Sequence, residues 1–236
     1  ENAVETLEEL KKQWEADKHK QRQALEELQQ ALKLDAPPNR IECYDISNIQ
    51  GTAAVGSMVV FEQGVPNKQL YRRFNIKTVS GPDDFASMEE VLGRRFKRWQ
   101  AAQDVKEVGA KVDPSFSILP DLLIVDGGKG QLGRSVKVLK EFGLEEKVLT
   151  AGLAKENELL FLPGKDLPLE VPRKSQGLFL LQRIRDEAHR FAITAHRNLR
   201  SKERLVSRLD QIPGIGPARK KALLTKFGSL SGVKKA

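Results

Sequence analysis

Several residue types that would restrict the fold or the location of this chain are scarce. Cys43 is the only cysteine among 236 residues, which excludes an internal disulfide and fits a reducing cytoplasm. No apolar run approaches the roughly 18 residues that a membrane span requires, so we expect no membrane partner and a cytoplasmic location. The first residues lack the basic start and apolar centre of a signal peptide. Because the chain also begins without Met, we expect it to be a piece of a longer protein.

Positive charge is concentrated in the C-terminal quarter of the sequence. The formal net charge is +8, but the segment from Arg173 to Ala236 holds 16 Lys and Arg against 4 Asp and Glu. The preceding 172 residues have a balance of −4. A basic segment after a mildly acidic body is typical of nucleic-acid binders, because cations that neutralise phosphates release counterions. A basic surface kept for solubility explains the same charge equally well.

The hydrophobic pattern predicts an α/β protein of three parts. Residues 1–38 predict a helical connector, either one helix or two shorter ones, that ends at Pro37-Pro38. Residues 39–200 have the order of elements of an RNase H-like mixed sheet flanked by helices, an order with which several other mixed α/β folds also begin. Residues 201–236 predict an all-α helix-hairpin-helix element that binds DNA.

The central part shows a change of period from strand to helix and back. Three strands with short turns between them favour an antiparallel meander. The apolar run at 121–125 suits a strand that is covered on both faces. The expected elements are strands at 40–46, 53–61 and 69–78, a helix at 85–101, a strand at 121–125, a helix at 131–142, strands at 148–153 and 158–162, a long helix at 178–199, and two short helices within 203–236.

Three aspartates fall where these elements begin or end. Asp45 lies late in the first strand, where a lone carboxylate is costly to bury unless it is paired or binds a metal. Asp126 ends a fully apolar strand, and Asp84 lies in the turn before a helix. Three carboxylates from three elements suit one or two hard cations, Mg²⁺ or Mn²⁺, of the kind that activate water for phosphodiester cleavage. Taken singly, Asp84 is explained as well by a helix N-cap and Asp126 by a glycine turn.

Further polar residues near these acids invite functional interpretations. His189 lies on the long helix, with His196 on nearly the same face. Beside a carboxylate site His189 would act as a general acid or base, contact a phosphate or support a ligand, whereas most helical histidines have no such role. Lys129 follows a pair of glycines without the spacing of a Walker loop, so we exclude ATP binding. We expect Lys129 to contact a DNA phosphate at the N-terminus of the next helix.

A short motif near the C-terminus predicts a DNA-binding hairpin. Gly214 and Gly216, on either side of an isoleucine, permit a tight turn that exposes amide donors at a helix N-terminus. The cations Arg219, Lys220 and Lys221 follow directly. This arrangement binds phosphates without reading bases. An ordinary helix-turn-helix packing unit is the alternative.

Five blocks, in order along the chain, resemble the C-terminal half of the UvrC family, the nuclease subunit of the bacterial UvrABC excision-repair system. They are ECYDISNIQG at 42–51, YRRF at 71–74, GPDDF at 81–85, DLLIVDGGKGQ at 121–131 and RDEAH at 185–189. The resemblance implies an RNase H-like endonuclease that makes the incision 5′ of a lesion with Mg²⁺ or Mn²⁺. It implies damaged double-stranded DNA and UvrB as partners, with UvrA involved indirectly.

The same resemblance implies a set of catalytic residues. The family's Asp-Asp-Asp-His set falls on Asp45, Asp84, Asp126 and His189, and the three aspartates would hold the metal. The family's second nuclease and its UvrB-binding segment are not visible in this sequence, which carries one hairpin where the family has two. From the residues alone, a non-catalytic DNA-clamping module and an RNase H-type ribonuclease remain alternatives.

Overall fold

The computed structural model describes residues 2–47, 54–79, 81–104, 112–154, 159–210, 214–227 and 232. The chain forms two compact units, Glu1–Ala192 and Ile193–Ala236. Within the described ranges, each helix is too short or too polar to cross a membrane.

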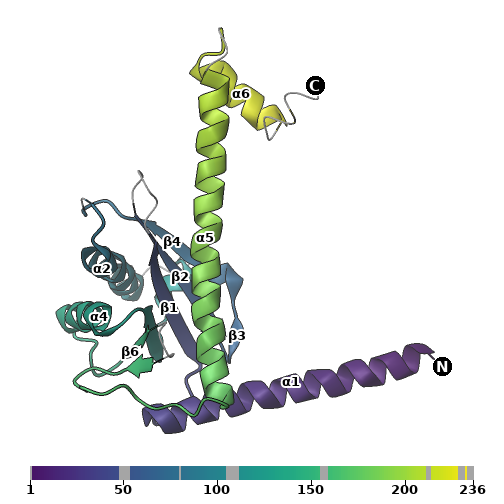
Figure 1. Cartoon of the computed structure of the whole chain (residues 1–236), viewed down its shortest axis with the longest axis vertical. Coiled ribbons are helices and arrows are strands. Elements are labelled where there is room, and N and C mark those ends of the chain that lie inside the picture. The colour runs from purple at the N-terminus through teal and green to yellow at the C-terminus, as the bar shows by residue number, and fades with distance from the viewer. Residues whose placement is uncertain are drawn as a thin grey trace. The chain divides into compact units, whose positions relative to one another are not determined.

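A mixed sheet, seven-stranded in the described part of the chain, forms the centre of the first unit (Figure 1). Its order is β3-β2-β1-β5-β6-β7, and β4 also pairs with β2. β1 is antiparallel to β2 and parallel to β5, β5 is parallel to β6, and β7 is antiparallel to β6. The strands are β1 (Arg40–Ser47), β2 (Val55–Glu62), β3 (Val65–Pro66), β4 (Arg72–Asn75), β5 (Leu122–Asp126), β6 (Leu149–Ala154) and β7 (Leu159–Phe161).

Helices cover both faces of this sheet (Figure 1). One face buries apolar side chains of α2 (Asp84–Gln103), α3 (Pro114–Ser117) and α4 (Lys129–Glu141). The other face buries the last turns of α1 (Asn2–Leu32) and the start of α5 (Gln176–Asp210). A 3-10 helix, η1 (Lys68–Leu70), leads into β4, and α6 (Pro217–Phe227) lies in the second unit. We call the two faces the α2 face and the α5 face.

The period-2 alternation of the strands decides which acids share a face. In β1, Ile41 and Cys43 belong to the apolar cluster of the α5 face, while Tyr44 belongs to that of the α2 face. Asp45 therefore continues the α5 face. In β5, Leu122 and Ile124 belong to the α5 cluster, so Asp126 also continues that face.

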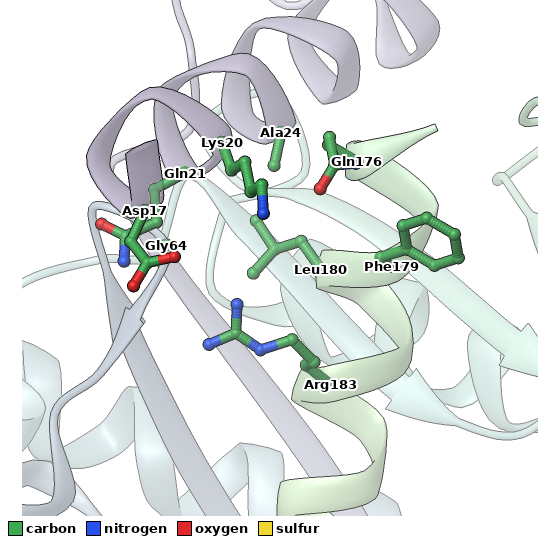
Figure 2. Close-up of a pocket in the computed structure, with 9 residues that line it drawn as sticks. All are labelled: Asp17, Lys20, Gln21, Ala24, Gly64, Gln176, Phe179, Leu180 and Arg183. Carbon is green, nitrogen blue, oxygen red and sulfur yellow. The ribbon is translucent and has the colours of Figure 1, made fainter. Parts of the chain in front are cut away.

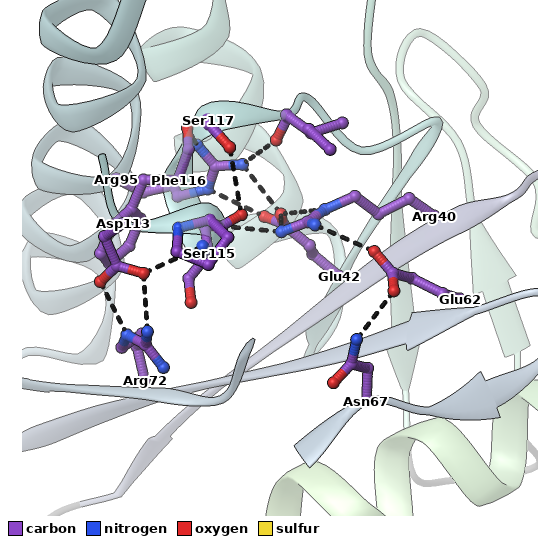
Figure 3. Close-up of polar contacts among 12 residues, drawn as sticks. Arg40, Glu42, Glu62, Asn67, Arg72, Arg95, Asp113, Ser115, Phe116 and Ser117 are labelled. Atoms are coloured by element: carbon purple, nitrogen blue, oxygen red, sulfur yellow. Dashed lines mark hydrogen bonds and ion pairs between the residues drawn. The ribbon is translucent and has the colours of Figure 1, made fainter. Parts of the chain in front are cut away.

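A buried network of charges ties β1 to α2 (Figure 3). The Glu42 carboxylate, which is fully buried, accepts hydrogen bonds from Nη2 of Arg95 at 2.8 Å, from Nε of Arg40 at 3.0 Å and from the Tyr44 hydroxyl at 2.6 Å. Arg95 also donates to the carbonyls of Phe116 and Ile118. Burial alone would raise the pKa of Glu42, but Arg95, Arg40 and the Tyr44 hydroxyl lower it by more, so the pKa lies below its ordinary value. A fully satisfied network of this kind fixes β1, and hence Asp45, against α2.

The structure confirms the predicted α/β class and the RNase H-like arrangement of strands and helices. Residues 2–32 form one helix, which decides between the two alternatives for this segment. One expectation was wrong: residues 203–210 do not form a separate short helix but continue α5 to Asp210. The predicted boundaries at 38/39 and 200/201 stay predictions.

Candidate metal centre

Two of the predicted acids lie near the ends of neighbouring parallel strands, at matching positions of the strand pairing. Tyr44 of β1 is paired with Val125 of β5, and Asp45 and Asp126 are the next residues of the two strands. Asp45 is only 5% exposed, and its Oδ2 accepts a hydrogen bond from the Ser47 hydroxyl at 2.8 Å. Ligands collect at strand ends of this kind in α/β sheets, so the sheet alone brings two carboxylates to one place.

His189 reaches these acids from α5. Leu181, Ile184 and Ala188 of this helix are buried against the sheet, which fixes the rotation of the helix about its axis. His189 directly follows Ala188, and its Nδ1 lies 3.9 Å from Oδ1 of Asp45. One ligand atom each from Asp45, Asp126 and His189 lies within 4.8 Å of the others. The fold therefore gathers three of the four residues that the family resemblance implied.

The polar atoms of this group suit a divalent cation. Nδ1 of His189 is shielded from solvent and has no hydrogen-bond partner in the described part of the chain, although 45% of the side chain is exposed. A buried nitrogen without a partner carries a desolvation cost that a bound cation would remove. Carboxylate oxygens suit Mg²⁺ and Mn²⁺, and imidazole nitrogen is a common ligand of transition metals. The donor set thus fits a divalent ion.

Cys43 lies two residues before Asp45 on the same face of β1. It is fully buried, and burial raises the pKa of its thiol well above the ordinary value. The nearby carboxylates of Asp126 and Asp45 raise this pKa further. The thiol therefore stays protonated at neutral pH, where it behaves as a small apolar side chain beneath the acids.

Asp84 is not in the group of converging ligand atoms. It is the first residue of α2, and the N-cap is Asp83, whose Oδ1 accepts a hydrogen bond from the Ala86 amide at 2.9 Å. The N-cap explanation of Asp84 was therefore wrong. A Cβ on Gly130 would lie 2.6 Å from the Phe85 ring, so the start of α2 lies beside the start of α4, which follows Asp126. A metal-binding role of Asp84 stays a prediction.

The glycine turn after Asp126 is held close to β6. The Gly127 amide donates to the Leu153 carbonyl at 3.1 Å, and a Cβ on Gly152 would lie 2.9 Å from the Gly127 carbonyl oxygen. Lys129 begins α4, and its Nζ donates to the Asp166 carbonyl at 2.6 Å. Contact of Lys129 with DNA stays a prediction.

In the second unit, the hairpin motif precedes α6. Gly214 has a φ of +84°, a left-handed conformation that favours glycine, and its carbonyl accepts a hydrogen bond from Nη1 of Arg219 at 3.0 Å. Gly216 lies just before Pro217, the first residue of α6. The side chains of Lys220, Lys221 and His196 lie outside the described residues. DNA binding by this motif stays a prediction.

A hollow of about 310 Å³ lies apart from the acids, between α1, the turn after β2 and the start of α5 (Figure 2). Lys20 of α1 and Arg183 of α5 bring positive charge to it, and Asp17 brings a negative one. None of the three converging residues lines this hollow.

Sequence reasoning missed the role of the YRRF block, which served only to support the family resemblance. The structure places Tyr71 and Arg73 of this block against Glu187 and Phe191 of α5, on either side of His189. The signal was present in the sequence as a run of aromatic and cationic residues that the proposed chemistry did not use.

A mixed sheet covered by helices, with aspartates at the ends of adjacent strands, defines an RNase H-like domain. Residues 29–193 match the family model described as the UvrC RNAse H endonuclease domain, and the chain belongs to this family. The predicted resemblance is thereby confirmed.

Curated relatives agree with this assignment. "UvrABC system protein C" of Symbiobacterium thermophilum is 50% identical over 249 residues, which cover 100% of this chain and 39% of the relative. The protein of the same name from Moorella thermoacetica is 49% identical over 236 residues, covering 100% of this chain and 37% of the relative. The chain thus spans less than two fifths of the length of these relatives. Among solved structures, human ENDOV aligns with 68% of this chain and 85% of its own, at 11% identity and a TM-score of 0.37.

Proposed function

We propose that this chain is a divalent-metal-dependent DNA endonuclease that makes the 5′ incision near lesions in bacterial nucleotide excision repair. The observation that carries the proposal is the convergence of Asp45, Asp126 and His189, whose ligand atoms lie within 4.8 Å of one another. Membership of the UvrC RNAse H endonuclease family supports the same function. The UvrABC name of the relatives supports a place in excision repair.

Each residue of the site has a distinct task in this proposal. Asp45 and Asp126, with His189 beside them, would hold Mg²⁺ or Mn²⁺, and Asp84 would complete the set. Such a cation, when bound, lowers the pKa of water and neutralises charge that develops on the phosphate. The Ser47 hydroxyl orients the Asp45 carboxylate, and the sheet keeps Asp126 beside it. Cleavage would leave a 3′-hydroxyl and a 5′-phosphate.

The proposed substrate is damaged double-stranded DNA in complex with UvrB, with UvrA acting earlier and the reaction taking place in the cytoplasm. Support comes from the basic C-terminal segment and from the hairpin of the second unit, in which Arg219 is exposed. In the hairpin, the DNA backbone would be bound by Gly214, Gly216, Arg219, Lys220 and Lys221. Near Asp126, it would be bound by Lys129. These contacts are independent of base sequence, so lesion choice would rest with the partners.

An incision assay tests this proposal. A duplex carrying one lesion, labelled at the 5′ end of the damaged strand, is loaded with UvrB and mixed with the chain and Mn²⁺. We expect a cut on the 5′ side of the lesion that Asp45→Asn abolishes while DNA binding persists, because the substitution removes a ligand charge and keeps the shape. Asp35→Asn makes the same chemical change at an exposed position and should retain full activity.

Three results would contradict the proposal in different ways. Incision by Asp45→Asn at the wild-type rate would remove the catalytic role of the acids. Tight DNA binding by the wild-type chain without any cutting would favour the non-catalytic clamping module. Faster cutting of an RNA–DNA hybrid than of duplex DNA would favour the ribonuclease.

A further inference from the structure

A row of paired residues crosses the sheet beneath α5 and starts at Asp45. Asp45 of β1 is paired with Ser57 of β2, and Ser57 is paired with Arg73 of β4. Directly paired residues point to the same side of a sheet, so Arg73 shares the α5 face with Asp45. The neighbouring residue Phe74 belongs to the α2 cluster, as the alternation requires. Two strand spacings, about 10 Å, separate Arg73 from Asp45.

Arg73 connects this row to α5 by two contacts with one residue. Its guanidinium carbon lies 4.2 Å from the centroid of the Phe191 ring, and its Nη2 donates to the Phe191 carbonyl oxygen at 3.2 Å. Stacking on an aromatic face and a directed hydrogen bond are contacts that a planar guanidinium makes and a lysine ammonium does not make together. Arg73 and this hydrogen bond are exposed to solvent, so the contact ties the Phe191 backbone to β4 at the protein surface.

Tyr71, two residues earlier in the chain, makes a second connection to the same helix. Its hydroxyl donates to Oε1 of Glu187 at 3.1 Å, and its ring meets the Phe191 ring edge-on at a centroid distance of 5.2 Å. Tyr71 is 7% exposed, and its hydrogen bond to Glu187 is partly buried. Burial, and then the Glu187 carboxylate, raise the pKa of Tyr71, which keeps the hydroxyl protonated as a donor. Nε of Arg190 donates to the other Glu187 oxygen at 2.6 Å and orients this carboxylate.

These contacts lie immediately on either side of His189. Glu187 is two residues before His189 and Phe191 two residues after it, while Ala188 is fully buried against the sheet. Asp45 and Asp126 are placed by the hydrogen-bond ladder between β1 and β5, but α5 has no such ladder with the sheet. Side-chain contacts must therefore set both the distance of α5 from the sheet and its rotation. Tyr71, Arg73, Glu187 and Phe191 form what we call the α5 contact group.

We propose that Tyr71 and Arg73 are positioning residues that hold the His189 imidazole over Asp45, and so complete the metal-binding group. This inference rests on the proposed function, because it concerns the same site. A ligand must be held to within about 0.5 Å for a catalytic constellation to work. Removal of a residue that orients a metal ligand typically lowers metal affinity or activity by roughly 10- to 100-fold.

Arg72 provides a matched control within the same strand. It is adjacent to Arg73 but pairs with Asp113 at 2.6 Å, and its guanidinium lies 6.0 Å from the centroid of the Phe116 ring, which belongs to the α2 cluster. Replacing Arg72 thus removes an arginine, an ion pair, an aromatic contact and hydrogen bonds to the backbone carbonyls of Gln69 and Tyr71, whereas its contacts among the described residues include none with α5. Any effect that Arg73 shows and Arg72 does not show belongs to the contact with α5.

The test is a double-mutant cycle with His189, using the full chain. The cycle compares the single variants Arg73→Gln, Tyr71→Phe and His189→Ala with the two double variants that combine His189→Ala with either of the others. Arg72→Gln is the control. Mn²⁺ binding is measured by the loss of the free-ion paramagnetic resonance signal, and kcat and KM by incision of the UvrB-bound lesion duplex. Circular dichroism checks that each variant is folded.

We expect Arg73→Gln to weaken Mn²⁺ binding and lower kcat by about tenfold with little change in KM. Tyr71→Phe, which loses only a hydroxyl, should cause a loss of about fivefold, as one hydrogen bond of ordinary strength would. Neither substitution should have a further effect in the His189→Ala background, because both act through the imidazole. Arg72→Gln should bind Mn²⁺ and cut DNA like the wild type.

Other outcomes separate this inference from the proposed function. Equal losses with and without His189, or wild-type Mn²⁺ binding and kcat in both Arg73→Gln and Tyr71→Phe, would overturn the positioning role and leave the nuclease standing. If Arg73→Gln fails to fold, Tyr71→Phe decides the matter alone. A wild-type chain that neither binds Mn²⁺ nor cuts DNA would overturn the proposed function, and this inference with it.

Discussion

Nδ1 of His189 faces Oδ1 of Asp45 across 3.9 Å. This separation is too long for a hydrogen bond. The shielded Nδ1 has no hydrogen-bond partner in the described residues. Both atoms would therefore be available to hold the divalent ion of the proposed function.

His189→Ala should therefore separate metal binding from stability. We expect Mn²⁺ affinity to fall by about tenfold or more, because one of the proposed ligands is removed. The melting temperature without metal should change little, because Nδ1 makes no hydrogen bond within the described residues that the substitution could remove. Mn²⁺ titration and a thermal melt measure the two effects. His19→Ala, at an exposed position of α1, is the control, and equal Mn²⁺ affinity in both variants would count against the site.

Gly152→Ala should disturb the turn that follows Asp126. A Cβ there would lie 2.9 Å from the Gly127 carbonyl and 3.3 Å from that of Gly128, and backbone atoms cannot move aside cheaply. We expect a destabilisation of about 1–3 kcal/mol in urea unfolding, together with weaker Mn²⁺ binding. Gly133→Ala is the matched control, because nothing lies within 4 Å of its Cβ on α4. That variant should gain up to about 1 kcal/mol, and equal behaviour of the two would contradict the steric argument.

Glu42→Gln should destabilise the first unit strongly at neutral pH. Arg40 and Arg95 would remain buried without a counter-charge, which typically costs about 3–5 kcal/mol. Glu89→Gln is the control, because Glu89 pairs with Arg134 and Lys137 at the surface, where an ion pair contributes about 1 kcal/mol or less. Urea unfolding at pH 7 measures both variants. A smaller loss for Glu42→Gln than for Glu89→Gln would contradict this account of the network.

The same carboxylate predicts how stability depends on pH. Burial raises the pKa of Glu42, but Arg95 and its other partners lower it by more, so the folded pKa lies below the ordinary value of 4.5. A group with a lowered folded pKa stabilises the fold fully above its unfolded pKa and loses that contribution as pH falls through the folded pKa. The difference in unfolding free energy between wild type and Glu42→Gln should therefore be constant from pH 7 to about 5 and shrink at lower pH. A difference that grows toward low pH would have the wrong sign.

Charge reversal of Arg219, Lys220 and Lys221 to Glu should weaken binding to all DNA sequences alike. The hairpin would bind phosphates, so reversing its positive charges should lower the affinity for DNA without changing the sequence preference. For every phosphate that the variant no longer neutralises, the negative slope of log K against log salt should become shallower by about 0.9. Fluorescence anisotropy at several salt concentrations measures this slope. Lys140→Glu, at an exposed position of α4, is the control, and an unchanged slope in the triple variant would exclude the hairpin as a DNA-binding element.

Leu28→Ala should show whether α1 is part of the folded domain. Leu28 is fully buried in the apolar cluster of the α5 face, and truncation of such a leucine costs about 2–5 kcal/mol. Trp14, farther back on the same helix, is 59% exposed, so Trp14→Ala should cost less than about 1 kcal/mol. Thermal melts compare the two. A small effect of Leu28→Ala would favour the predicted domain boundary at 38/39. A large effect would mean that the folded domain includes the last turns of α1, so that its boundary lies within this helix.

The strand positions of two acids could be predicted from the sequence because an apolar run that ends in a carboxylate is a local pattern. Asp45 and Asp126 each follow such a run, but the strand before Asp126 is apolar on both faces, so only the pairing of β1 with β5 shows that the two acids share a face. Asp84 and His189 were less certain, since each also had an ordinary explanation on its helix and only the family resemblance joined them to the two strand acids as one catalytic set. The structure places His189 with the two strand acids, whereas Asp84 lies outside the converging set.

The buried charges and the tie between β4 and α5 could not be predicted, for a physical reason. Arg40 and Glu42 lie in a strand whose pattern indicated apolar residues, and Arg95 lies on a helix 53 positions after its partner Glu42. Their burial is tolerated only because the fold brings the charges together, and no local pattern encodes such a partnership. The end of the long helix was also predicted wrongly. The sequence near residue 200 has no local signal that shows whether the helix ends there or continues to Asp210, as α5 does.

Strand β1 carries a carboxylate on each of its two sides, with Glu42 among arginines on one side and Asp45 toward His189 on the other. A shift of β1 by one residue would turn each side chain to the opposite face of the sheet. Glu42 would then lie without arginines in the apolar cluster of the α5 face, and Asp45 would be buried in the apolar cluster of the α2 face. The ion pairs of Glu42 therefore help to fix the register that places Asp45 on the side of His189. A scaffold that is to carry Asp45 in the same register would need Arg40 and Arg95 as well, although both lie on the other side of the sheet.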